Sequence, residues 1–129
     1  MEKTESRQER YERGRARRLE LLGADVAEHV KYLEDLAPDL ERIVMENLFG
    51  DIFLRPGLDA KTRSLCTICV LASQGRETQT RAHIRGALNV GAKKEEIVEA
   101  LVQLLFYAGL PAASTGLKIA SEVFKERGL

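Results

Sequence analysis

Glycine and proline residues divide this chain into segments whose apolar residues recur at helical spacing. Three prolines and ten glycines occur in 129 residues, and sustained period-two alternation is hard to find between them. The segment from residue 94 to 108 is the clearest case, since Ile97, Leu101 and Leu104 fall on one helical face. The sequence therefore predicts an all-helical protein of about six to seven helices.

Local start and stop signals place these helices. Asp59 is a suitable N-cap, Gly75 and Gly91 are suitable helix ends, and Pro38 and Pro111 suit first helical turns. We expect the helix after Asp59 to be central and buried on nearly every side, and the second and third helices to pair as a hairpin. The expected helices span about residues 4–22, 24–36, 38–48, 60–73, 77–90, 94–108 and 111–127.

Length and composition limit the protein class. With 129 residues and 14.4 kDa, we expect a single domain, residues 1–129, whose core helices lie within residues 59–127. Twenty basic and twenty acidic residues leave no net charge, which argues against general nucleic-acid binding. The longest apolar stretch covers about eight residues, whereas a membrane span needs about twenty. We therefore expect a soluble, cytoplasmic protein with neither nucleic acid nor membrane as a partner.

The first segment, residues 1–22, is too polar to form a core element alone. Tyr11, Leu19 and Leu22 form a sparse apolar stripe among many arginines and glutamates. Such a stripe needs a partner surface. We expect this helix to pack on another subunit of a homo-oligomer.

Cys66 and Cys69 form a CxxC pair, a spacing found in thiol redox and metal sites. A reactive thiol is favoured at a helix N-terminus, but Cys66 lies about two turns beyond Asp59. A zinc site would need two more soft ligands, and His29 and His83 stand at unrelated spacings. The pattern favours two small core residues and no metal, with thiol chemistry as the alternative.

His83 is the leading candidate for a catalytic group. Helical spacing places Arg76 and Gln79 on its face, together with very small residues that permit close approach. Such a face could border a pocket, in which an imidazole can give or take a proton. Gln103 and Tyr107 could supply hydrogen bonds to the same pocket. The alternative is a histidine that is hydrogen-bonded at a helix interface.

Four stretches closely resemble the carboxymuconolactone decarboxylase family. They are LFGDIFLRPGLDAKTRSL, HIRGALNVG, EEIVEAL and YAGLPAA, and the resemblance runs from RYERGRARR almost to the C-terminus. Several motifs in the right order are far more specific than any one of them. The resemblance implies an alkylhydroperoxidase-like helical bundle, built on a helical hairpin and assembled into trimers or hexamers.

The redox members of that superfamily carry a Glu, then a CxxC pair, then a His four residues after the second Cys. Counting back from His83, the two cysteine positions hold Arg76 and Gln79. The glutamate position holds Ser64. Only the histidine matches, so the resemblance does not carry over the peroxidase relay. A thiol-dependent hydroperoxidase that uses the CxxC pair at a new position, and a non-catalytic ligand-binding oligomer, stay open as alternatives.

The resemblance implies decarboxylation of 4-carboxymuconolactone, or of a similar small lactone acid, to an enol-lactone. No cofactor is needed in principle, because the electron pair released with carbon dioxide enters the conjugated lactone carbonyl. His83 would then serve as acid or oxyanion donor. Arg76 would bind a carboxylate of the small anionic substrate, with Arg63 and Arg55 as further candidates.

Overall fold

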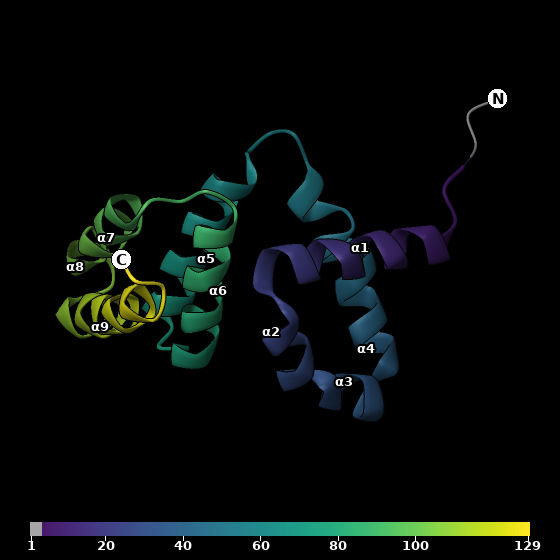
Figure 1. Ribbon diagram of the computed structural model, residues 1–129, viewed down its shortest axis with the longest axis horizontal. Coiled ribbons are helices and arrows are strands. Elements are labelled where there is room, and N and C mark those ends of the chain that lie inside the picture. The colour runs from purple at the N-terminus through teal and green to yellow at the C-terminus, as the bar shows by residue number, and fades with distance from the viewer. Residues whose placement is uncertain (1–3) are drawn as a thin grey trace. The chain divides into compact units, whose positions relative to one another are not determined.

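Every regular element in the described part of the chain is a helix (Figure 1). The computed structural model describes residues 4–129, except for the side chains of Ala27 and His29, so residues 1–3 of the predicted polar segment lie outside it. The prediction of an all-helical fold is confirmed. The elements are α1 (Arg7–Leu22), α2 (Ala24–His29), α3 (Lys31–Leu36), α4 (Pro38–Ile43), the π-helix η1 (Val44–Phe49), the 3-10 helix η2 (Ile52–Leu54), α5 (Ala60–Ser73), α6 (Glu77–Asn89), α7 (Lys94–Val102), α8 (Leu104–Tyr107) and α9 (Leu110–Glu126).

The chain divides into two compact units, Met1–Leu58 and Asp59–Leu129. The division falls at Asp59, where the sequence predicts the start of the core helices. The expectation of one domain over residues 1–129 stays a prediction. Among residues 4–129, no helix is long and apolar enough to cross a membrane.

In the first unit, α1 crosses η1 at two glycines. A Cβ atom on Gly14 would lie 1.7 Å from the carbonyl oxygen of Met45, and one on Gly50 would lie 2.8 Å from that of Arg10. Only glycine permits this backbone approach. Gly50 N–H closes the π-helical turn onto the Met45 carbonyl at 2.9 Å, and Arg13 Nη2 donates to the Gly50 carbonyl at 2.6 Å. Elsewhere in this unit α3 contacts α4, from which Ala37 alone separates it, and the hairpin of the second and third helices stays a prediction.

The first unit also buries two carboxylates that the sequence did not single out. Tyr11 OH donates to Glu41 Oε2 at 3.0 Å, and Arg42 Nε donates to Glu46 Oε1 at 2.7 Å. Burial, then the hydrogen bond to Glu41, raises the pKa of Tyr11. Helix α1 is thus hydrogen-bonded to α4 through Tyr11, and an ion pair between Arg7 Nη2 and Glu46 Oε2 at 3.3 Å joins α1 to η1.

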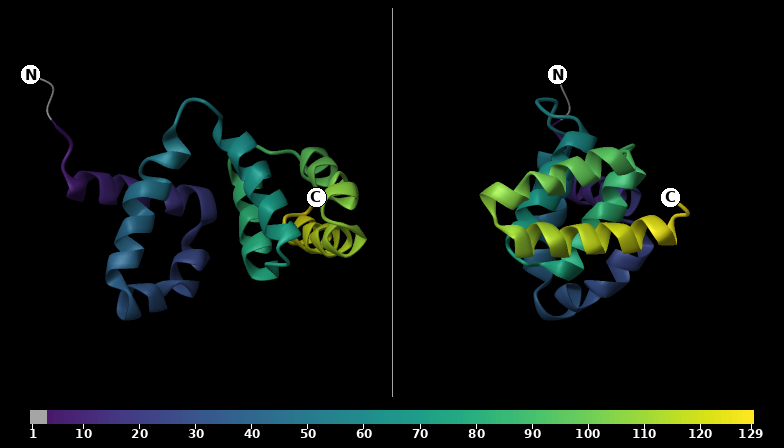
Figure 2. Two further views of the ribbon diagram at one scale, coloured as in Figure 1. Left: turned by 180° about the vertical axis from the view of Figure 1, so that it is seen from behind. Right: turned by 90° about the vertical axis from the view of Figure 1, so that its left-hand side faces the viewer.

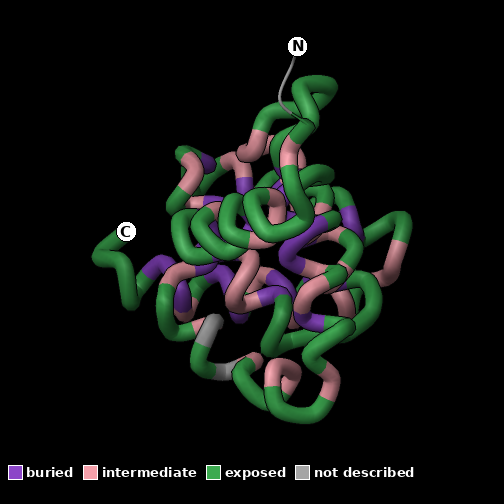
Figure 3. Tube along the Cα trace, turned by 90° about the vertical axis from the view of Figure 1, so that its right-hand side faces the viewer, coloured by how far each residue is buried: buried purple, intermediate pink, exposed green. Residues whose placement is uncertain are grey.

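In the second unit, α7 and α9 pack across the α5–α6 pair (Figure 2). Their buried apolar side chains form one continuous core. Figure 3 colours every buried residue of the described chain purple along the Cα trace. A Cβ on Gly116 of α9 would lie 2.9 Å from Cδ2 of Leu101, so the glycine leaves room for this side chain of α7. The core residues are Ile68, Ala72, Ile84, Ala87, Ala92, Ile97, Leu101, Leu104, Ala113, Ile119, Ala120, Val123 and Phe124.

The predicted starts of α5 and α6 and the end of α5 are confirmed, and α6 ends one residue early. Asp59 caps α5, since its Oδ1 accepts from Thr62 N–H at 2.7 Å. These bonds from Thr62 lower the pKa of Asp59. Gly75 ends the α5 turn at φ +68°, a conformation that glycine adopts without strain.

Two predicted helices are interrupted by single residues. Val30 (φ −105°, ψ 8°) separates α2 from α3, and Gln103 separates α7 from α8. The segment that begins at Pro38 changes from α to π winding after Ile43. A one-residue interruption barely shifts the apolar spacing, so the pattern could not reveal it.

The expectation that α5 is buried on nearly every side is wrong for the described chain. Its buried residues are Ser64, Ile68 and Ala72, which form one stripe, whereas Val70 is 54% exposed. Helices α6, α7 and α9 all contact α5, but the opposite side of α5 is left open. An apolar composition allows a helix to be buried, but the number of neighbouring helices decides how much of its surface is buried.

We expect Gly14→Ala to weaken the α1–η1 crossing. Alanine favours an open helix position by about 1 kcal/mol, but here its methyl group would overlap the Met45 carbonyl. The free energy of unfolding should fall by about 1–3 kcal/mol in urea titrations followed by circular dichroism. Gly57→Ala is the control, since a Cβ there meets no described heavy atom within 4 Å. A more stable Gly14→Ala variant would contradict the close approach.

Candidate functional site

His83 lies in the middle of α6 with one edge of its ring withdrawn from water. The residue is partly buried, and its Nδ1 is buried without a hydrogen-bond partner among the described residues. Burial lowers the pKa of His83 from 6.5 to about 4, because poorly solvated surroundings disfavour the imidazolium ion. At neutral pH the ring is therefore uncharged, with one N–H donor and one acceptor nitrogen.

Helix α6 is a rigid support for this ring. Its buried residues include Thr80, Ile84 and Ala87, and the Thr80 hydroxyl donates to the Arg76 carbonyl at 2.7 Å. Arg85 also ties α6 to α9 through Glu126, with Nε and Nη2 both 3.0 Å from carboxylate oxygens. The backbone that carries His83 is therefore fixed by packing and by ionic contacts.

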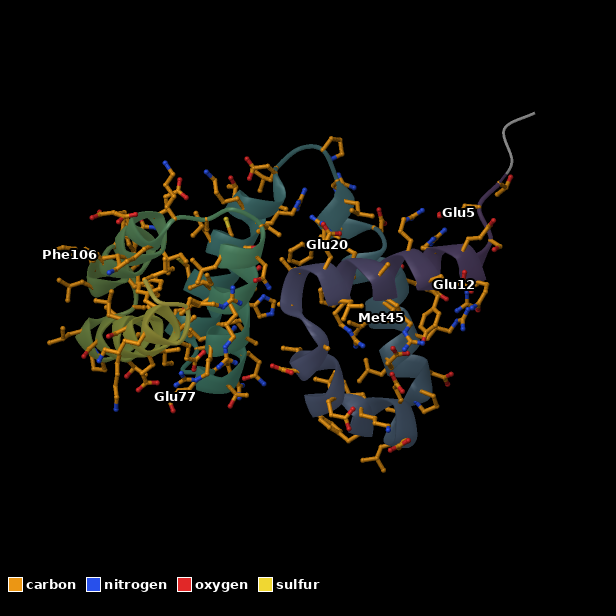
Figure 4. All side chains as sticks on the ribbon, viewed as in Figure 1. Glu5, Glu12, Glu20, Met45, Glu77 and Phe106 are labelled. Carbon is orange, nitrogen blue, oxygen red and sulfur yellow. The ribbon has the colours of Figure 1, made fainter. Side chains whose placement is uncertain are left out.

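Arg76 is the N-cap residue of α6, with a non-helical ψ of 75°, and Gln79 lies in the first turn of this helix. Both side chains are exposed. Arg76 helps line a shallow groove with Thr80 of α6 and with Thr115 and Gly116 of α9. Figure 4 labels Glu77, which marks this end of α6. Of the predicted trio, Arg76 lines this groove, whereas Gln79 and His83 are not among its lining residues.

Gln103 is hydrogen-bonded to a cysteine and not placed beside His83 by any described contact. It hydrogen-bonds the Cys69 thiol, whose Sγ donates to the Ala100 carbonyl at 3.4 Å. Burial, and next the neighbouring Cys66, raise the pKa of Cys69, and the bond from Gln103 offsets this in part. The thiol form is therefore favoured, whereas redox and nucleophilic chemistry need the thiolate.

The expectation of core burial is wrong for Cys66, which is exposed, and only partly met by Cys69. Cys66 lies off the stripe by which α5 packs on its neighbours, and this explains its exposure. Among the described residues, no group of three or more His, Cys, Asp or Glu could hold a metal ion.

Tyr107 and Arg63 lie elsewhere on the second unit, and Arg55 lies in the first unit. Tyr107, at the end of α8, is 87% exposed beside Phe106, which is 89% exposed and points away from the helices in Figure 4. Arg63 is partly buried in α5, and Arg55 is exposed in the loop before it. An exposed aromatic pair of this kind is typical of a surface that a partner covers.

In the sequence, Ser64 stands out only because it occupies the position of the glutamate found in redox members of the superfamily. In the structure Ser64 is 1% exposed, and its buried Oγ has no hydrogen-bond partner in the part of the chain that is described. A serine at the buried turn of an otherwise apolar helix was the available signal. It gave no indication of where the hydroxyl would bond.

Residues 38–122, which run from α4 into α9 and include His83, match the carboxymuconolactone decarboxylase family. The chain belongs to this family. It is 38% identical to 4-carboxymuconolactone decarboxylase of Acinetobacter baylyi over 123 residues, which cover 95% of this chain and 92% of that protein. It is 28% identical to the nitrosuccinic acid decarboxylase npaB of Metarhizium robertsii, over 90% of this chain and 82% of that protein. An uncharacterized 15.0 kDa protein of Paracoccus denitrificans is 42% identical, over 75% of this chain and 74% of its own length.

Some relatives of this chain are named for the reaction that they catalyse. Two of these relatives, at 38% and 28% identity, are named as decarboxylases. In this family member His83 combines a buried nitrogen with a partly exposed ring. The ring can therefore present a neutral N–H or an acceptor nitrogen to a small molecule at neutral pH.

The buried imidazole should make folding stability depend on pH. The folded pKa of about 4 lies below the unfolded value of 6.5, so the unfolded chain takes up a proton that the folded chain refuses. Stability is unaffected above pH 6.5 and is lost as the pH falls from 6.5 toward 4. His83→Gln removes this loss, which amounts to about 3 kcal/mol at most. Urea titrations from pH 7.5 to 4.5 measure the difference, and parallel curves for the two proteins would contradict it.

Proposed function

We propose that this protein decarboxylates a small dicarboxylic acid without a cofactor, at a site centred on His83. The observation that supports this most is the neutral, partly withdrawn imidazole on α6, in a chain whose family relatives include decarboxylases of two different acids. The relatives suggest the reaction, and the imidazole offers a way to stabilise it.

The acids named for those two relatives have a common chemical pattern. Each contains a carbon atom that bears a carboxylate, an electron-accepting group and a CH2–COOH arm. The acceptor is a nitro group in nitrosuccinic acid and an unsaturated lactone in 4-carboxymuconolactone. We therefore propose a substrate class of succinate-type diacids with an acceptor on the carbon that loses carbon dioxide.

In the proposed reaction the bond from that carbon to its carboxylate breaks. Carbon dioxide leaves, the electron pair moves into the acceptor, and negative charge develops on an acceptor oxygen. A carbon then takes up a proton: in the nitro acid it is the carbon that lost carbon dioxide, and in the lactone it is the carbon next to the lactone carbonyl, which leaves the enol-lactone. Removal of the carboxylate from water favours the first step, and a preorganised hydrogen bond to the new oxyanion stabilises it.

The pKa of His83 bears on which of its two expected roles it takes. A group with a pKa of about 4 is unprotonated in the free enzyme at neutral pH, so it is a poor general acid. A neutral imidazole N–H can still donate a hydrogen bond to the acceptor oxygen. We assign His83 the donor role, and the final proton to water or to another group in the site.

Arg76 is the proposed partner of the second carboxylate. Arg76 is exposed at the start of the helix that carries His83, and its planar fork matches a carboxylate in bidentate fashion. Gln79 lies between the two along the helix and could bind the acceptor or the carboxylate arm. Arg63 and Gln103 are further candidates for substrate contacts.

The proposed working form is a homo-oligomer, trimer or hexamer, in the cytoplasm. The exposed side chains of Phe106 and Tyr107 support a partner surface on the second unit. Tyr107 would join a substrate site as part of such an assembly. The raised pKa of Cys69 weighs against the thiol-dependent alternative.

Replacement of His83 and replacement of Arg76 should change different kinetic constants. His83→Ala should lower kcat by about two to four orders of magnitude, as expected for loss of an oxyanion donor. Arg76→Ala should mainly raise KM, and Arg76→Lys should restore it only in part, because lysine lacks the planar fork. Steady-state assays with nitrosuccinate and with 4-carboxymuconolactone measure both effects.

Lys118→Ala is the control, since this exposed residue of α9 has no proposed part in the site. It should leave KM unchanged. Normal turnover by His83→Ala would make the histidine a structural residue. Absence of turnover by the unmodified protein on both acids would contradict the proposed function.

A further inference from the structure

Two buried polar atoms on the α5–α6 helix pair lack a hydrogen-bond partner. One is Ser64 Oγ of α5, in a residue that is 1% exposed, and the other is His83 Nδ1 of α6. Neither atom bonds to any residue between 4 and 129. A buried polar atom without a partner is costly, so each of the two calls for an explanation.

Helix geometry brings the two residues to nearby levels. The helices are consecutive, pack extensively against each other and are joined by a short turn (Figure 1). At 1.5 Å per residue, Ser64 lies about 14 Å before the end of α5 and His83 about 9 Å after the start of α6. They are therefore separated by about one helical turn along an antiparallel pair.

The other enclosed hydroxyls of this helix pair have local partners. The Thr67 hydroxyl donates to the Arg63 carbonyl at 2.9 Å, and the Thr80 hydroxyl donates to the Arg76 carbonyl at 2.7 Å. Ser64 differs from both, since its hydroxyl does not bond back to its own helix. Its hydrogen is available for an acceptor outside α5.

The neutral ring of His83 offers such an acceptor. A neutral imidazole has one unprotonated nitrogen, and Nδ1 is the nitrogen that is enclosed within the protein. We propose that Ser64 is the positioning partner of His83: its hydroxyl donates to one buried water, which in turn donates to Nδ1 and so holds the ring proton on Nε2.

This assignment explains how His83 presents a donor to the substrate. With Nδ1 accepting from the water that Ser64 holds, Nε2 must carry the hydrogen and can donate it to the acceptor oxygen. The opposite tautomer would aim a lone pair at a developing negative charge. The catalytic consequence rests on the proposed decarboxylation, whereas the tautomer assignment does not.

The tautomer can be measured without activity. The chain has two histidines, so His83→Gln identifies the His83 signals in long-range 1H–15N NMR spectra. We expect the Nε2–H form to dominate in the unmodified protein at pH 7, and Ser64→Ala to shift the ring toward the Nδ1–H form. Thr67→Val is the matched control, since it removes a partly buried hydroxyl of the same helix α5 whose partner is a backbone carbonyl. Identical His83 spectra in the Ser64→Ala and unmodified proteins would overturn the proposal.

Kinetics test the catalytic half of the inference. Ser64→Ala should lower kcat on nitrosuccinate by about 10- to 100-fold, the scale on which partners that orient a histidine act, with KM changed less than about threefold. Thr67→Val should keep kcat. An active enzyme whose Ser64→Ala variant shifts tautomer but keeps full kcat would overturn the catalytic role alone. An inactive unmodified protein would defeat the proposed function, and the NMR result would still decide the Ser64 assignment.

Discussion

The cost of placing an imidazolium ion in poorly solvated surroundings governs the chemistry of this site. Burial holds the pKa of His83 near 4, so the ring is neutral wherever the protein works near neutral pH. A neutral ring serves as an oriented hydrogen-bond donor, whereas a charged one would compete for the substrate carboxylates. The helical scaffold matters because it keeps the ring in this setting: α6 packs on α5 and is bound to α9 through Arg85 and Glu126.

This setting fits the proposed class of reaction. Decarboxylation next to an electron acceptor needs little from a protein besides a dry place for one carboxylate, an anchor for the other and a donor for the new oxyanion. Helix α6 offers an exposed Arg76 at its start and a withdrawn imidazole at His83. One arrangement of this kind could act on acids with different acceptors, because it need not recognise the acceptor beyond an oxygen atom.

The elements that could be predicted from the sequence are those fixed by local chemistry. Asp59 caps α5 and Gly75 ends it, because a capping carboxylate and a left-handed glycine act within one turn of the chain. The exposure of Cys66 depends on how many helices pack around α5, which apolar spacing does not report. The interruption at Gln103 is one residue long and barely shifts that spacing. His83 and Arg76 were found from their helical spacing, but the enclosed hydroxyl of Ser64 became evident only once its missing partner was seen.

A crystal structure with bound 3-nitropropanoate tests the central claim most directly. This compound is what nitrosuccinate becomes when the carbon next to its nitro group loses carbon dioxide, so it retains the acceptor and the carboxylate arm. We expect a nitro oxygen about 3 Å from Nε2 of His83 and the carboxylate at an arginine, with Arg76 the proposed one. A ligand bound away from α6, with His83 contacting only protein or water, would contradict a decarboxylation site built on this imidazole.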